Sequence, residues 1–179
     1  EIFKNIKPFS ESEVDTNVVY GQYGRGIVAG KEVRAYLQEE NIPEGSSTET
    51  FVALKLALNT PRWKGVPIYI RAGKRMCRDV TEISIQFKDS SKNLPQFAGQ
   101  KNPNVLTIRI QPDEGIILRF DAKKPGLDYQ LQPVNMEFRY NSAFANSPLI
   151  EAYRRLISDA IKGDHMLYPN AEAVEATWK

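Results

Sequence analysis

The chain has 179 residues, of which 41% are hydrophobic and 26% charged, and its 24 Lys and Arg against 22 Asp and Glu give a formal net charge of +2. This composition is that of a globular domain long enough to bury one sizeable core, and it excludes a collagen-like or a disordered chain. The balanced charge argues against a dedicated nucleic-acid or membrane-surface binder, because such proteins usually carry a concentrated basic excess.

Residues 1–5 lack the basic and then apolar layout of a signal peptide, and the first residue is not Met. We therefore expect the chain to be cut from a longer protein. Residues from about 17 to 140 form a strand-rich block. Apolar and mixed positions alternate with period two in five of its segments, which is the pattern of strands that have one apolar face, and 17–23 and 66–71 are expected as further strands. The predicted strands are 17–23, 51–58, 66–71, 82–88, 106–111, 116–121 and 136–140.

Turn residues separate these strands at 43–45, 112–115 and 125–126. The connection Gln111–Gly115 is short, and it predicts a hairpin between the strands on either side of it. The polar stretch 89–104 is expected to form a long loop. Strands of this kind are typical of an antiparallel sheet with one covered face.

A pattern typical of helices follows the predicted strands in the sequence. Apolar residues over 149–161 recur at i, i+3, i+4 and i+7, which predicts a helix with one apolar stripe. Ser147-Pro148 is its expected start and Gly163 its expected C-cap. Asn170 is expected to cap a second helix over 171–178.

These elements predict an α+β fold: a large, mainly antiparallel sheet with helices packed on one face, followed by C-terminal helices, in a single domain over residues 1–179. The second face of the sheet is mixed, because its apolar side chains lie among Lys55, Arg109 and Arg119. A half-apolar face is covered either by a second chain, through sheet-mediated dimerisation, or by helices and loops of the same chain. The pattern leaves both alternatives open.

Few residues of this chain can carry chemistry. It has one His and one Cys and contains no GxGxxG, GxxxxGK[ST] or HExxH pattern, so we predict no catalytic residue, no cofactor-binding residue and no metal site. Cys77 cannot form an internal disulfide, which favours a reducing, cytoplasmic location. No apolar run approaches the roughly 18 residues of a membrane span. The chain is expected to complete a site that another part of the protein provides.

The segment 66–78 is the best candidate site. A β-rich run ends at Gly73, and glycine permits a sharp turn or the close approach of a ligand. Lys and Arg side chains, which donate hydrogen bonds to phosphate oxygens, surround it. They are Arg71, Lys74, Arg75 and Arg78. The segment is either an anion or sugar-phosphate contact at the end of a strand, or a solvated basic loop.

Four other residues are candidate chemical groups. His165 follows the expected C-cap without a nucleophile in any recognised pattern, so we interpret it as a surface or capping residue. Cys77 is either a reactive thiol beside basic residues or a small apolar residue. Asp113 and Glu114 lie in a turn, where Asp commonly bonds to backbone N–H groups, and we do not interpret them as a general-acid pair.

Several long segments follow the motifs of one family, in order and over nearly the whole chain. Residues 62–75 resemble the motif RWxGVPFYLRTGKR, residues 47–55 the motif TETF(V/A)A, and residues 108–115 the motif IRIQPDEG. Further matching segments are 19–23, 151–156 and 174–178. The chain is thereby similar to the C-terminal domain of the glucose-6-phosphate dehydrogenase family.

The resemblance implies an enzyme that oxidises glucose 6-phosphate to 6-phosphogluconolactone with hydride transfer to NADP, in some members to NAD, and so opens the oxidative pentose phosphate pathway. It implies an N-terminal half with a glycine-rich phosphate loop and a catalytic histidine in a DHYLGKE-type segment. Neither lies in this chain, and His165 does not match that histidine. We expect NADP to be bound mainly by the missing half, the isolated fragment to be inactive, and the enzyme to be a cytoplasmic homodimer formed through the sheet.

Two substrate-binding residues follow from the resemblance. Lys74 matches the lysine that reaches the sugar phosphate, and Arg78 is the candidate for the second contact, because the family's basic residue five positions further on is Asp79 here. Arg71 and Arg109 match arginines near a second, structural NADP of some members, and the existence of that site stays open. The alternative function is a non-catalytic sheet domain that binds a protein or a sugar phosphate.

Overall fold

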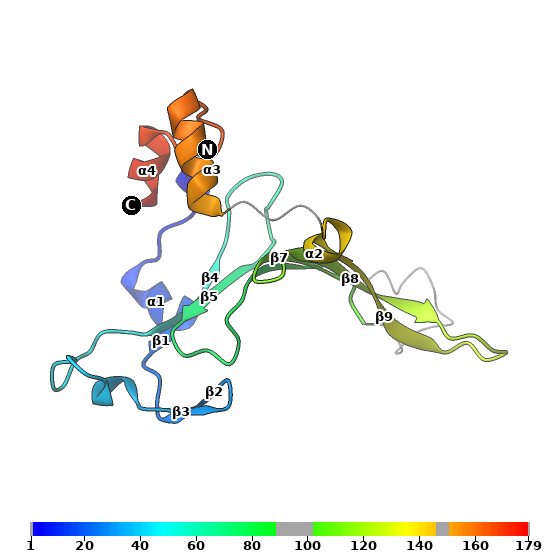
Figure 1. Cartoon of the computed structure of the whole chain (residues 1–179), viewed down its shortest axis with the longest axis horizontal. Helices are drawn as coiled ribbons and strands as arrows, with labels where there is room; N and C mark the ends of the chain where they lie inside the picture. The colour runs from blue at the N-terminus through cyan, green and yellow to red at the C-terminus, as the bar shows by residue number, and fades with distance from the viewer. Residues whose placement is uncertain (1, 89–101, 146–150, 179) are drawn as a thin grey trace. The chain divides into compact units, whose positions relative to one another are not determined.

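The structure, a computed structural model, describes residues 2–88, 102–145 and 151–178. The chain forms two compact units, one of Glu1–Arg78 with Ala152–Lys179 and one of Asp79–Glu151. Antiparallel strands occur in both units, and the first also contains the C-terminal helices, which confirms the predicted α+β class. The colours of Figure 1 follow the residue number, so the elements of each unit can be found there.

The first unit is built on a three-stranded antiparallel sheet with the order β1-β4-β5. Its strands are β1 (Val18–Gly21), β4 (Phe51–Leu56) and β5 (Ile68–Gly73). Leu54 lies opposite Val18 on one side and Ile70 on the other, so one face of the sheet carries apolar side chains from all three strands. The other face mixes apolar side chains with Lys55 and Arg71.

A short hairpin that the alternation did not predict lies between the first two strands of this sheet in the sequence. β2 (Gly26–Val28) pairs with β3 (Lys31–Val33), and the 3-10 helix η2 (Tyr36–Gln38) follows. Ala29 and Gly30 form the turn with φ of 50° and 77°, the left-handed backbone that matches the twist of a two-residue hairpin. Strands of three residues are too short for a period-two pattern to identify them.

The other elements of the first unit are helical. They are η1 (Phe3–Asn5), α1 (Glu11–Asn17), α3 (Ala152–Lys162) and α4 (Ala171–Thr177). Gly163 follows α3 with φ of 69°, as expected of a C-cap glycine. The Oδ1 atom of Asn170 accepts a hydrogen bond from the N–H of Ala173 at 2.8 Å, which confirms the predicted N-cap of α4. The expected start of the preceding helix, Ser147-Pro148, lies outside the described residues.

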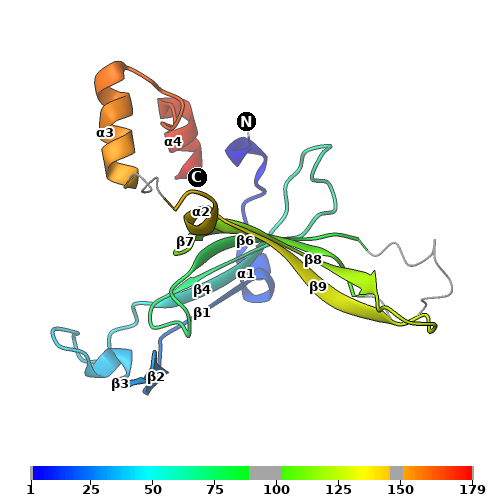
Figure 2. The same ribbon diagram turned by 45° about the vertical axis from the view of Figure 1, so that its right-hand side comes forward.

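The second unit contains a four-stranded antiparallel sheet in the order β6-β7-β8-β9, and α2 follows its last strand (Figure 2). The elements are β6 (Thr81–Gln86), β7 (Val105–Gln111), β8 (Gly115–Lys123), β9 (Leu131–Arg139) and α2 (Tyr140–Ala143). β7 and β8 form the predicted hairpin. β9 starts earlier than predicted, because Pro133 is tolerated in a strand at the edge of this sheet, and Tyr140 belongs to α2. Most of the expected loop 89–104 lies outside the described residues.

One face of the four-stranded sheet, here called the apolar face, carries apolar side chains on every strand. Two rows of cross-strand neighbours form its centre: Ile83, Ile108, Ile116 and Phe138, then Ile85, Leu106, Leu118 and Met136. Ile83 is 51% exposed and Met136 63% exposed. The part of the chain that the structure describes therefore leaves this face largely open to solvent.

The opposite side of the same sheet, here called the mixed face, alternates with it along every strand. Its rows are Glu82, Arg109, Gly115 and Arg139; Ser84, Thr107, Ile117 and Glu137; and Gln86, Val105, Arg119 and Asn135. The hydroxyl groups of Ser84 and Thr107 are hydrogen-bonded at 3.1 Å. Gly115 is buried because the backbone of Phe138 lies directly against it, so a Cβ there would collide with the Phe138 carbonyl oxygen.

The expectation of one sizeable core is wrong for residues 2–88, 102–145 and 151–178, among which Leu58, 8% exposed, is the only buried hydrophobic side chain. Composition gives the number of apolar residues. It does not show whether the segments that bury them lie in the same part of the chain. The predicted strands form a three-stranded and a four-stranded ladder in this part of the chain, where one large sheet was expected. Alternation predicts the faces of a strand and leaves its neighbours unspecified.

Candidate functional site

The candidate site begins where β5 ends. Gly73, the last residue of β5, pairs with Phe51 of β4. The N–H of Lys74 donates a hydrogen bond to the carbonyl oxygen of Thr50 at 2.8 Å, so the ladder holds the backbone one residue beyond the strand. A Cβ on Gly73 would lie 2.9 Å from Cδ2 of Phe51 and 3.0 Å from Sδ of Met76. Glycine is therefore the residue that lets these two side chains close over the strand end.

Arg75 is held differently from the other cations of the segment. Its φ is 55°, in the left-handed region, and its Nη2 atom lies 3.0 Å from Oε1 of Glu39. The hydroxyl of Tyr23 donates to the same oxygen at 3.2 Å. The hydrogen bond to Glu39, reinforced by one with Tyr23, raises the pKa of Arg75. Arg75 is therefore part of an ion pair and is not a free ligand for an anion.

The two predicted substrate-binding residues, Lys74 and Arg78, are exposed, as is Arg71. Within the described residues, none of these three side chains makes an ion pair or a hydrogen bond. The predicted cluster of four cations thus divides into one paired residue and three whose charged groups are available to solvent. An ammonium on a fixed backbone is suited to phosphate oxygens.

Other candidate residues gain no chemical partner from the fold. His165 is exposed in the connection between α3 and α4, where its carbonyl oxygen accepts the N–H of Tyr168 at 3.0 Å. Cys77 is a free, exposed thiol. Asp113 has φ of 57° within the β7–β8 turn, and the Glu114 carbonyl oxygen accepts the N–H of Tyr140. These contacts support structural roles.

No metal site is formed in the described ranges, which hold no group of three or more His, Cys, Asp and Glu side chains placed to bind an ion. The same ranges contain no helix with the length and apolarity that crossing a membrane requires. Arg71 lies on β5 in the first unit, and Arg109 lies on β7 in the second. The Nε atom of Arg109 is buried and has no hydrogen-bond partner in the described structure.

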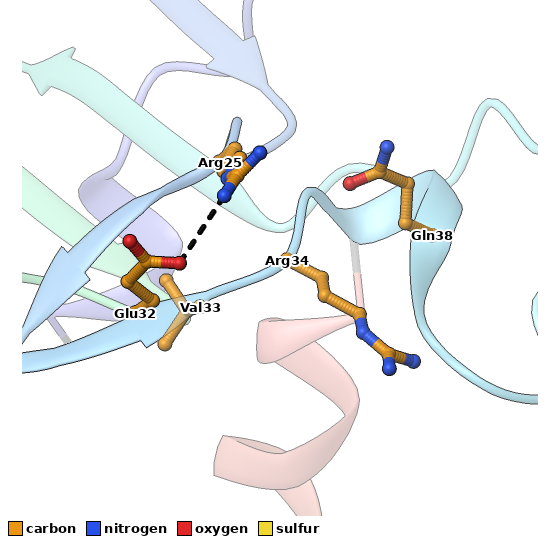
Figure 3. A pocket seen from close by; sticks show the side chains of 5 residues that line it. All are labelled: Arg25, Glu32, Val33, Arg34 and Gln38. Atoms are coloured by element: carbon orange, nitrogen blue, oxygen red, sulfur yellow. Dashed lines mark hydrogen bonds and ion pairs between the residues drawn. The ribbon is translucent and has the colours of Figure 1, made fainter.

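A shallow pocket that sequence analysis missed lies at the β2–β3 hairpin (Figure 3). Its lining residues are Arg25, Glu32, Val33, Arg34 and Gln38. The Nη2 atom of Arg25 pairs with Oε2 of Glu32 at 3.1 Å, and Oε1 of Gln38 accepts the N–H of Ala35 at 3.2 Å. Three of the five lining side chains, Arg25, Glu32 and Gln38, are thus engaged in contacts with the protein itself. Gly30, after the short apolar run Ile27-Val28, was the available signal for this hairpin.

Comparison with known proteins gives one consistent result. All 179 residues match the family model described as glucose-6-phosphate dehydrogenase, C-terminal domain. Glucose-6-phosphate 1-dehydrogenase of Chlamydia pneumoniae is 46% identical over 100% of this chain and 35% of the relative, and that of Aggregatibacter actinomycetemcomitans is 45% identical over 97% and 35%. A solved structure of glucose-6-phosphate dehydrogenase in complex with its substrate glucose-6-phosphate superposes with a TM-score of 0.84 at 34% identity, covering 99% of this chain and 35% of that one. The chain therefore spans about a third of the length of these proteins.

Proposed function

The chain belongs to the family of glucose-6-phosphate dehydrogenase C-terminal domains, and from this premise we propose that it is the substrate-binding and dimerisation domain of a longer dehydrogenase. That enzyme oxidises glucose 6-phosphate to 6-phosphogluconolactone and passes the hydride to a nicotinamide cofactor. The cofactor is NADP, and its binding residues lie mainly outside this chain, because the sequence has no glycine-rich phosphate loop. The enzyme acts in the cytoplasm, a location in keeping with a lone, unpaired cysteine.

The observation that carries the proposal is Lys74, an exposed ammonium whose backbone is fixed at the end of β5. A Lys ammonium is a compact point charge with three donors, which suits the phosphate of a sugar phosphate. The similar solved protein is described in complex with glucose-6-phosphate. Lys74 is the first phosphate contact in our proposal, and Arg78 supplies a second positive charge where Asp79 replaces the basic residue expected from the family resemblance.

The chain binds the substrate and leaves the chemistry to the rest of the protein. Oxidation at C1 of the sugar needs a group that accepts the hydroxyl proton as the hydride leaves. His165 is exposed beyond α3, with no ion pair or side-chain hydrogen bond in the described residues. We assign no catalytic residue to this chain, and we expect the isolated 179-residue fragment to show no turnover.

The mixed face of the four-stranded sheet is the proposed homodimer interface. It combines Ile117 and Val105 with charged and hydroxyl side chains, the composition of many protein surfaces that associate. The apolar face is more hydrophobic, and a hydrophobic sheet face is normally buried by a second layer of the same protein. We therefore assign the apolar face to the remainder of the longer chain and the mixed face to the second subunit.

The test of the proposed function uses the whole protein from which this chain derives. We expect Lys74→Ala to lower kcat/KM for glucose 6-phosphate by roughly 10- to 100-fold, chiefly through KM, because a hydrogen bond to a charged group contributes about 1.5–3 kcal/mol. Arg78→Ala should have a smaller effect in the same direction. Lys31→Ala, an exposed lysine on β3, is the matched control and should leave both constants unchanged.

Three outcomes separate the alternatives. If kcat and KM of Lys74→Ala equal those of the wild type, the assignment of Lys74 is wrong. If the whole protein binds glucose 6-phosphate without reducing NADP or NAD, the non-catalytic alternative replaces the enzyme. If the isolated 179-residue chain reduces the cofactor by itself, the catalytic group lies within it and our division of roles fails.

A further inference from the structure

The residue after Lys74 has an unfavourable backbone conformation. Arg75 has φ of 55°, although it carries a Cβ and is neither Asn nor Asp. A residue keeps such a conformation when the surrounding contacts hold it there. The contacts that hold Arg75 therefore also determine the backbone from which the Lys74 side chain extends.

The ion-pair partner of Arg75 lies 36 positions earlier in the sequence. Oε1 of Glu39 accepts hydrogen bonds from Nη2 of Arg75 at 3.0 Å and from the hydroxyl of Tyr23 at 3.2 Å. The Glu39 side chain is 28% exposed, so this pair is screened less than a fully solvated one. Its carboxylate is thus the point where Tyr23 and Arg75 meet.

Glu39 is itself fixed by the fold. Its N–H donates to the carbonyl oxygen of Tyr36 at 3.1 Å and so closes η2. The N–H of Tyr36 donates to the carbonyl oxygen of Tyr23 at 3.0 Å, and the two tyrosine rings meet edge to face at 5.9 Å. The N–H of Tyr23 then donates to Oγ1 of Thr50, whose carbonyl oxygen holds the N–H of Lys74. Glu39 is therefore connected to the Lys74 backbone in two ways. One connection is through Arg75, the next residue, and the other is through Tyr23 and Thr50.

We propose that Glu39 is a positioning residue for substrate binding: through Arg75 and Tyr23 it holds the turn that carries Lys74. The pairing has a second effect, because it withdraws Arg75 from the anion and leaves Lys74 as a free cation at the strand end. Glu39 does not touch the substrate and acts through Arg75. This inference rests on the proposed function of Lys74.

The experiment compares Glu39→Ala with Glu40→Ala in the whole protein. Glu40 is the matched control, since it is the next residue, carries the same charge, is exposed, and has no ion pair among the described residues. A misplacement of about 1 Å can cost about 100-fold in rate, and we expect Glu39→Ala to lower kcat/KM for glucose 6-phosphate about tenfold, mainly through KM. Glu40→Ala should match the wild type in KM, kcat and Tm.

A double-mutant cycle with Lys74→Ala distinguishes positioning from general stability. If Glu39 acts by placing Lys74, then Glu39→Ala adds little to the loss of kcat/KM already caused by Lys74→Ala. If the losses of kcat/KM caused by the two single variants multiply in the double variant, Glu39 has a merely structural role and the inference is overturned. The same holds if Glu39→Ala lowers Tm and leaves KM unchanged. Glu39→Gln, which keeps an acceptor oxygen, should rescue part of the KM change.

The cycle keeps this inference separate from the proposed function. An inactive wild-type protein, or an unaltered Lys74→Ala variant, would reject the function itself. An active wild type with an impaired Lys74→Ala variant, but with Glu39→Ala equal to Glu40→Ala, would reject only the role of Glu39.

Discussion

At the scale of single residues, Gly73 determines how closely the strand end is packed. A Cβ added to Gly73 would lie only 2.9 Å from the ring of Phe51 and 3.0 Å from the sulfur of Met76. The backbone of Gly73 has no positive φ, so its requirement is steric. The site depends on this contact because Lys74 follows directly.

We predict that Gly73→Ala destabilises the protein by about 1–3 kcal/mol, the usual cost of forcing an extra carbon into a filled space. It should also raise KM for glucose 6-phosphate, since Phe51 or the strand end must move. Urea unfolding of the whole protein measures the first effect and steady-state kinetics the second. The control is Gly24→Ala, where nothing lies within 4 Å of the added Cβ. Equal behaviour of the two variants would contradict the steric argument.

Part of this site was predictable from the sequence. Gly73 and Lys74 lie in a contiguous motif, and their residue types indicate the chemistry directly. The role of Glu39 was not predicted, because Glu39 lies 36 positions before Arg75 and only the fold brings the two side chains together. The separation of Arg75 from the free cations was missed for the same reason, since composition treats the four basic side chains as equivalent.

At the scale of elements, α1 shows how a short helix is held at its first turn. Oε1 of Glu13 lies 2.7 Å from Nζ of Lys7, and Oε2 accepts the N–H and the hydroxyl of Ser10 at 3.0 and 2.9 Å. The hydrogen bond with Lys7, followed by those with Ser10, lowers the pKa of Glu13 from 4.5 to about 2. The ionised carboxylate is the form that completes this turn.

The pH dependence of α1 follows from the direction of this shift. Because the pKa is lower in the folded state, the stabilisation is complete above pH 4.5 and is lost as the pH falls towards about 2. We predict that Glu13→Gln lowers Tm at pH 6. The Tm difference between this variant and the wild type should shrink steadily as the pH falls from 4.5 to about 2. Glu11→Gln, in the same turn, is the control. A Tm difference that stays constant over this range would refute the ionic origin of the effect.

Longer strands and helices were easier to predict from the sequence than short ones. β4 and β6 to β9, with six to nine residues, were identified because period-two alternation needs several repeats to be recognised, and β1 and β5 were expected as two further strands. α1 was missed because Val14 is its one apolar side chain of appreciable size, and a helix without an apolar stripe gives no 3.6-residue signal. The pair Ser10 and Glu13, spaced as in a capping box, was the signal that remained.

At the scale of the whole molecule, the two faces of the four-stranded sheet have different partners in our proposal. The expected core was not found in the described residues, because the apolar face needs a covering layer from elsewhere. Sequence analysis could measure how apolar each face is. It could not determine what covers either face, since in our proposal the covering layers come from the rest of the longer chain and from a second subunit.

We predict that the whole protein sediments as a dimer and that Ile117→Asp, a change in the middle of the mixed face, shifts it towards the monomer. Burying an unpaired carboxylate in an interface is costly, and the dissociation constant should rise at least about 100-fold. Ile27→Asp makes the same substitution at an exposed residue of β2, a strand of the other unit, and should leave the dimer intact. A monomeric wild type at high concentration would reject the interface.

The exposed thiol of Cys77 has a practical consequence. It is the sole sulfhydryl in these 179 residues, and it follows Lys74 by three positions. A maleimide dye attached there would lie three residues from the proposed phosphate contact, and a change in its fluorescence on addition of sugar phosphate would report binding even in variants that no longer turn over.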